Sequence, residues 1–71
     1  MIELRELEYI IGLLELNRDN YYIYFLKIRD LIHYLINNLD RLSEKEIKKL
    51  RLLIYRFEII KSLMEEKEHS R

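Results

Sequence analysis

Hydrophobic residues recur along this chain with the three-to-four-residue spacing of an α-helix. In the first segment they occupy positions i, i+3, i+7 and i+10 of one helical face, as Leu4, Leu7, Ile11 and Leu14. The alternation of apolar and polar residues that would indicate a half-buried strand is absent there. Leu and Glu, both good helix formers, are abundant in the same stretch. The pattern therefore predicts a first helix over about residues 2–17.

A polar segment interrupts this pattern at residues 17–20. Three of its four residues are Asn or Asp, which favour caps and turns over helix interiors. We therefore expect a break in this segment and a second helix over about residues 20–40. The main apolar stripe of that helix consists of Tyr21, Tyr24, Phe25, Ile28, Leu31, Ile32, Leu35 and Leu39.

The start of a third helix has the clearest local signal in the chain. Ser43 and Glu46 have the spacing of a capping box, in which each side chain accepts a hydrogen bond from the other residue's backbone N–H. A third helix is therefore predicted over about residues 44–68. Its inward face consists of Leu50, Leu53, Phe57, Ile60 and Met64.

Together these elements predict an all-α fold, a small three-helix bundle forming a single helical domain over residues 1–71. An alternative keeps residues 2–42 as one helix, because the apolar spacing stays in phase across the break and only Arg18 interrupts it. The chain would then be a long helical hairpin whose first residues lack an intramolecular neighbour, so it would dimerise. We favour the break, since Asn and Asp disfavour helix interiors.

The predicted helices also carry apolar residues outside their main stripes. A helix in a small monomeric bundle keeps one apolar face inward and a polar face outward, whereas these helices are apolar on two sides. Contiguous exposed apolar patches commonly mark interaction sites, and Tyr is enriched in interfaces. The candidate protein-binding residues are Leu52, Tyr55, Ile59 and Leu63 in the third helix, Ile2, Tyr9, Leu13 and Leu16 in the first, and Tyr22 in the second.

Composition argues against most kinds of chemistry. The chain is 49% hydrophobic and 37% charged with a formal net charge of zero, a profile unlike that of a disordered chain. It has no Cys and one Gly, which excludes a thiol nucleophile and a glycine-rich phosphate loop. Asp30 and His33 could form a contact within the second helix, but no nucleophile or metal set accompanies them. We therefore expect a non-enzyme without cofactor, metal or small-molecule substrate.

Charge is distributed unevenly despite the overall balance. Residues 1–20 contain five acidic and two basic residues, whereas residues 41–61 contain three acidic and seven basic residues. The simplest use of this asymmetry is internal, with the acidic first segment packing near the basic third helix. The alternative is a nucleic-acid-binding helix. Its candidate residues are Lys45, Lys48, Lys49 and Arg56, with Tyr55 nearby.

The sequence thus favours a non-enzymatic module for protein–protein interaction, either a homo-oligomer or a small accessory subunit of a larger complex, including one that processes nucleic acid. Nucleic-acid binding by the third helix is the alternative function. Because no apolar run reaches the length of a membrane span, we expect a cytoplasmic protein without membrane contact. Abundant Ile, Leu, Glu, Lys and Arg, with no Gln or Thr, is typical of hyperthermophile proteins, although an AT-rich genome produces a similar bias.

Overall fold

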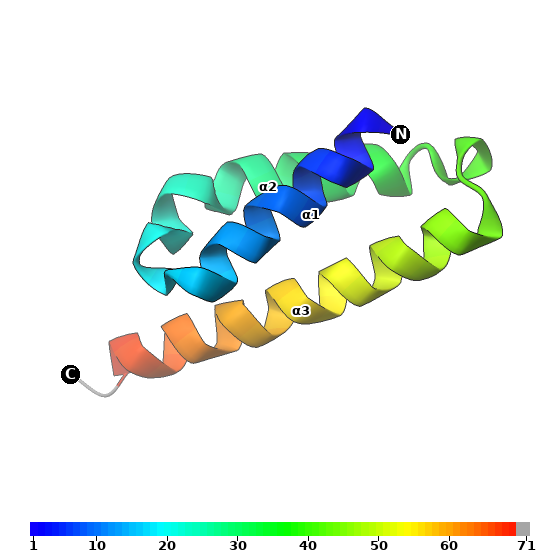
Figure 1. Ribbon diagram of the computed structural model, residues 1–71. Coiled ribbons are helices and arrows are strands. Elements are labelled where there is room, and N and C mark those ends of the chain that lie inside the picture. Colours follow the sequence, from blue (N-terminus) through cyan, green and yellow to red (C-terminus); the bar gives the residue numbers. More distant parts are fainter. Residues whose placement is uncertain (70–71) are drawn as a thin grey trace.

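The computed structural model describes the backbone of residues 1–69 and the side chains of residues 1–67. Within that range the chain is an all-α three-helix bundle without strands, as predicted (Figure 1). The helices are α1 (Ile2–Leu16), α2 (Tyr21–Ile36) and α3 (Glu44–His69). Short 3₁₀ turns, η1 (Arg18–Asn20) and η2 (Leu39–Arg41), connect them.

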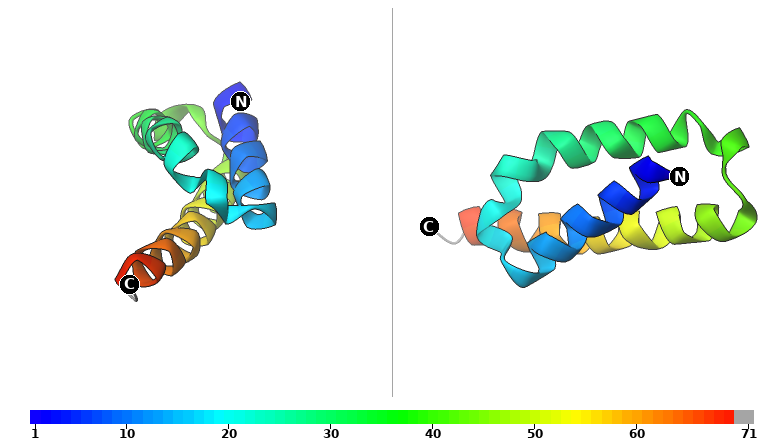
Figure 2. Two further views of the ribbon diagram at one scale, coloured as in Figure 1. Left: turned by 90° about the vertical axis from the view of Figure 1, so that its left-hand side faces the viewer. Right: turned by 45° about the horizontal axis from the view of Figure 1, so that its top comes forward.

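The bundle has an up-down-up arrangement in which α1 and α3 run in the same direction. Figure 2 shows α2 and α3 as the two long sides of a hairpin, with α1 packed on one side of the pair and running obliquely across α3. The molecule is elongated, with principal extents of 43 × 18 × 16 Å. Since α3 is the longest helix, it presents the longest continuous outer surface of the described chain.

The break between the first two helices follows from the chemistry of Asn17. Its backbone is extended (φ −149°, ψ 97°), and its side-chain Oδ1 accepts a hydrogen bond from the backbone N–H of Asp19 at 3.1 Å. Such local side-chain bonds compete with the helical hydrogen bonds of the backbone. The alternative of one helix over residues 2–42 is therefore wrong.

The second helix ends earlier than its apolar spacing suggests. It was expected to continue to residue 40, but α2 stops at Ile36. The Asn38 side-chain amide donates to the backbone carbonyl of Tyr34 at 2.7 Å, and its backbone leaves the helical region (φ −126°, ψ 31°). Leu39 consequently falls in η2 and is exposed instead of facing inward.

The capping box at the start of α3 is formed in both directions. The Ser43 N–H donates to Glu46 Oε1 at 3.0 Å, and the Glu46 N–H donates to Ser43 Oγ at 3.2 Å. Two of the N–H groups that a helix start leaves without helical partners are thereby satisfied. The third helix accordingly begins at Glu44, as predicted.

All three helices contribute to one apolar core. The predicted inward face of α3 is buried throughout, and Tyr21 and Phe25 of α2 contact the ring of Phe57 at centroid distances of 6.0 and 6.2 Å. Among the described side chains no polar or charged residue is buried. Six side chains are almost completely inaccessible to solvent: Leu7, Ile11, Leu14, Ile28, Leu35 and Leu53.

Candidate protein-binding surface

A row of large apolar side chains lies on the outside of α3. Leu52, Tyr55, Ile59 and Leu63, termed the α3 stripe, each retain between 41% and 64% of their accessible surface. Successive residues of a helix are about 100° apart, so burying Leu53 turns Leu52 outward. The stripe is thus the second apolar side that the sequence pattern indicated.

A second apolar row lies on the outside of α1. Ile2, Tyr9 and Leu16, termed the α1 ridge, are seven residues apart and retain between 66% and 87% of their accessible surface. Leu13 differs from the expectation because it is half-buried. It follows Glu6 by seven residues and so lies on the same side of α1, where Glu6 pairs with Lys27 of α2 at 3.2 Å.

The second helix exposes more apolar surface than Tyr22 alone. Tyr22 is exposed as expected, while its neighbour Tyr21 is buried, with the two rings edge-to-face at 5.1 Å. Ile23 and Leu26 are also largely exposed. The 100° periodicity identified the surface side of α2 less clearly because apolar residues occupy almost every direction around its first two turns.

Ion pairs join α1 to α3 along the groove between them. Lys49 Nζ lies 2.9 Å from Glu8 Oε2, and Arg56 donates from Nε to Glu15 Oε2 at 2.9 Å and from its terminal nitrogen to the other carboxylate oxygen. The two pairs are one heptad apart on both helices, which fixes the parallel alignment. The acidic first segment therefore packs against the basic third helix, as its charge predicted.

These ion pairs reduce the number of free cations on the candidate nucleic-acid surface. Of its four cations, Lys49 and Arg56 already bind carboxylates. Lys45 and Lys48 are exposed and form no ion pair with any part of the chain that the structure describes. Two lysines give a smaller electrostatic footprint on a phosphate backbone than four cations.

The partners of two glutamates lower their pKa values. The Arg56 guanidinium, by hydrogen bonding first and by charge second, lowers the pKa of Glu15. The Glu15 carboxylate, through the same hydrogen bond and its charge, raises the pKa of Arg56. The Ser43 N–H, followed by the amino terminus 3.3 Å away, lowers the pKa of Glu46. Both carboxylates are therefore more stable as anions in the folded chain than in the unfolded chain.

The lowered pKa of Glu15 predicts that the folded chain loses stability in acid. A carboxylate with a depressed folded-state pKa stabilises the fold above its unfolded pKa, near 4.5 for Glu15, and that stability is lost as pH falls through the lower folded value. Because Glu15 is 41% exposed, we expect its contribution to be only about 0.5 kcal/mol. Urea unfolding at pH 7 and pH 3 should show a smaller pH-dependent loss in Glu15→Gln than in the native chain. Equal losses in both would contradict the assigned role of Glu15.

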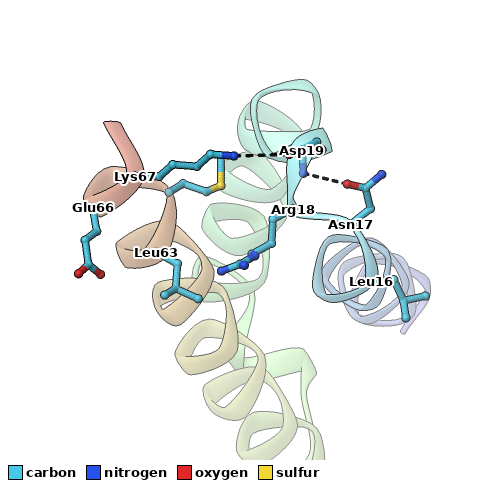
Figure 3. A pocket seen from close by; sticks show the side chains of 8 residues that line it. Leu16, Asn17, Arg18, Asp19, Leu63, Glu66 and Lys67 are labelled. Atoms are coloured by element: carbon cyan, nitrogen blue, oxygen red, sulfur yellow. Dashed lines mark hydrogen bonds and ion pairs between the residues drawn. The ribbon is translucent and has the colours of Figure 1, made fainter. Parts of the chain in front are cut away.

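Two adjoining hollows lie where α1 ends beside the last turns of α3. They have volumes of about 600 and 300 Å³ and share Arg18 and Leu63 in their linings. Figure 3 shows Arg18 extending toward α3, with Leu63 on α3 and the Leu16 side chain on the side of α1 turned away from α3. Asp19 and Lys67 face each other across the larger hollow at 3.9 Å. The lining of the larger hollow thus combines apolar side chains with charged ones, of which Asp19 and Lys67 are paired.

Other candidate chemistry is not assembled in the described residues. Asp30 contacts Arg29 at 3.5 Å, and no hydrogen bond joins it to His33. Within the searched residues no group of three His, Cys, Asp or Glu side chains is positioned to hold a metal ion. None of the described helices is both long enough and apolar enough to cross a bilayer. Comparison of the chain with family models, curated proteins and solved structures finds no match.

Proposed function

We propose that this chain is a non-enzymatic cytoplasmic module that binds another protein chain through the α3 stripe and the adjoining α1 ridge. It would act as a homo-oligomer or as a small accessory subunit of a larger complex, including one that processes nucleic acid. The observation that carries the proposal is the exposure of four large apolar side chains on α3, beside a core that is complete without them.

The energetics support a binding role for the stripe. Covering apolar surface stabilises a complex by roughly 25 cal/mol for each Å² removed from water. Leu52, Ile59 and Leu63 lie outside the buried core of the isolated bundle, and a contiguous apolar row on a small domain promotes association. Tyr55 adds a large ring with a polar end, the side-chain type most common at the centres of interfaces.

Nucleic-acid binding remains the second candidate, favoured only by the exposure of Lys45 and Lys48. A titration with double-stranded and single-stranded DNA at two salt concentrations separates the two functions. Tight binding that weakens steeply with salt would favour the nucleic-acid role, whereas protein binding through apolar side chains should change little.

Photocrosslinking tests the proposed function directly. Tyr55 would be replaced by benzoylphenylalanine in cells of the source organism, with the same replacement at Tyr34, an exposed tyrosine of α2, as the matched control. We expect a discrete protein adduct from position 55 that is absent from position 34. Absence of an adduct from position 55, or the same adducts from both positions, would contradict a binding role for the α3 stripe.

A further inference from the structure

The exposed side of α3 has the spacing of a coiled-coil seam. Counting outward-facing positions at alternate steps of four and three residues gives a row that shares Leu52, Tyr55 and Ile59 with the stripe and continues beyond them in both directions, passing through Ser62 beside Leu63. Each member of this row, termed the α3 seam, is exposed: Lys48, Leu52, Tyr55, Ile59, Ser62 and Glu66. Such spacing keeps one row of side chains facing a neighbouring helix along its length.

The two ends of the seam carry opposite charges. It begins at Lys48 and ends at Glu66, and neither side chain forms an ion pair within the described part of the chain. A parallel copy of the seam would place Lys48 against Lys48 and Glu66 against Glu66, which is unfavourable. An antiparallel copy would place each lysine against a glutamate.

We propose that the partner at this surface is a second copy of the chain, packed antiparallel along the α3 seam. This inference rests on the proposed function, because it names the partner of the same surface. In an antiparallel coiled coil, each layer joins a residue that follows a four-residue step on one helix to a residue that follows a three-residue step on the other. The register that joins Lys48 to Glu66 of the second copy also joins Leu52 to Ser62 and Tyr55 to Ile59. One alignment thus places opposite charges together at the ends and large apolar side chains together at the centre.

Residues beside the seam fit this register in part. Arg51 falls opposite Glu65 of the second copy, which adds two opposite-charge pairs by symmetry. Near the twofold axis Arg56 approaches Arg56 of the second copy, and Glu58 approaches Glu58 of the second copy. Both contacts are unfavourable because they bring like charges together. The charge of Arg56 is already neutralised by Glu15, which leaves Glu58 as the repulsive element in a register with four complementary pairs.

The first helix extends the contact beyond the seam. The pairing of Glu15 with Arg56 places the end of α1 level with residue 57, the midpoint of the register. Leu16, 87% exposed, therefore lies level with this midpoint, on α1 beside the hollow that Leu63 also lines (Figure 3). A stable interface covers about 800 Å² per partner, about a seventh of the 5360 Å² accessible surface, so the seam and the end of α1 would both be needed.

Charge exchange across the seam tests this arrangement. Sedimentation equilibrium of the native chain should give a dimer at high concentration. Lys48→Glu alone and Glu66→Lys alone each place like charges together at two symmetric points, and should raise the dimer dissociation constant about tenfold. The double variant Lys48→Glu/Glu66→Lys restores opposite charges and should return the constant to its native value. Circular dichroism of each variant would verify that the helices remain folded.

Three results would overturn the inference: a monomer at every concentration, unchanged association of the single variants, or a double variant no better than the singles. Photocrosslinking from position 55 distinguishes failure of the antiparallel dimer from failure of protein binding by the α3 stripe. An adduct of Tyr55 at twice the mass of the chain supports the second copy. A specific adduct of any other mass would overturn the second copy and leave protein binding by the α3 stripe supported.

Discussion

Leu53→Ala should lower the free energy of unfolding by about 3 kcal/mol, whereas Leu52→Ala should change it by less than about 0.5 kcal/mol. The two leucines are adjacent in α3, so the change in helix propensity is the same at both positions. They differ in burial, because Leu53 is completely inaccessible to solvent and Leu52 retains 56% of its surface. Truncating Leu53 removes apolar contacts and leaves a cavity, while truncating Leu52 removes atoms that water already surrounds.

The comparison is measured by urea unfolding followed by circular dichroism. A domain of this size has a total stability of roughly 4–10 kcal/mol, so Leu53→Ala should shift the midpoint strongly. Both variants should be measured at a protein concentration low enough to keep the chain monomeric, since association stabilises the folded state by mass action. If the two losses were equal, Leu52 would belong to the fold and the α3 stripe would not be a free surface.

Local chemistry made two of the helix boundaries predictable. Ser43 and Glu46 form both hydrogen bonds of the capping box, because the motif depends only on residues three apart. The break after α1 was also indicated by residue type, since the Asn17 side chain offers the Asp19 N–H an alternative to the helix. Signals of this kind act within a few residues and are therefore readable without the fold.

The end of α2 and the burial of Leu13 could not be predicted in the same way. Apolar spacing continues through Leu39, but the Asn38 side chain donates to the Tyr34 carbonyl and the Asn38 backbone leaves the helical region. Leu13 is half-buried because α1 crosses obliquely with one flank toward α2, where Glu6 meets Lys27. Both features depend on how helices cross, which the periodicity of a single helix does not specify.

Periodicity was more informative for the candidate site than for these details. It separated Leu52 and Ile59 from the buried Leu53 and Ile60, and the structure exposes the first two and buries the others. Charge counts indicated that α1 and α3 attract each other, yet the individual pairing of Arg56 with Glu15 required the parallel alignment. Together with the pair of Lys49 and Glu8, this pairing occupies two of the four cations of the nucleic-acid candidate.

Leu52→Glu combined with Ile59→Glu should raise the dissociation constant of the complex formed by the α3 stripe at least about 100-fold. Each carboxylate would be buried without a partner in the complex, which costs more than the lost apolar contact alone. In the free chain both side chains are largely exposed, so the monomer should keep its helices. Arg29→Glu, on the exposed surface of α2, changes the net charge by the same two units and should leave association unaffected.

Two measurements distinguish an interface role of Leu52 and Ile59 from a structural role. They are the mass in solution over a range of concentrations and the circular dichroism of the same samples. Loss of association with an unchanged helical spectrum would support the stripe as a binding surface. Loss of helicity in the double variant even at concentrations where the native chain is monomeric would show that Leu52 and Ile59 hold the bundle together. Since the core of α3 is formed by Leu53, Phe57 and Ile60, we expect the free chain to unfold at nearly the same urea concentration with or without the two carboxylates.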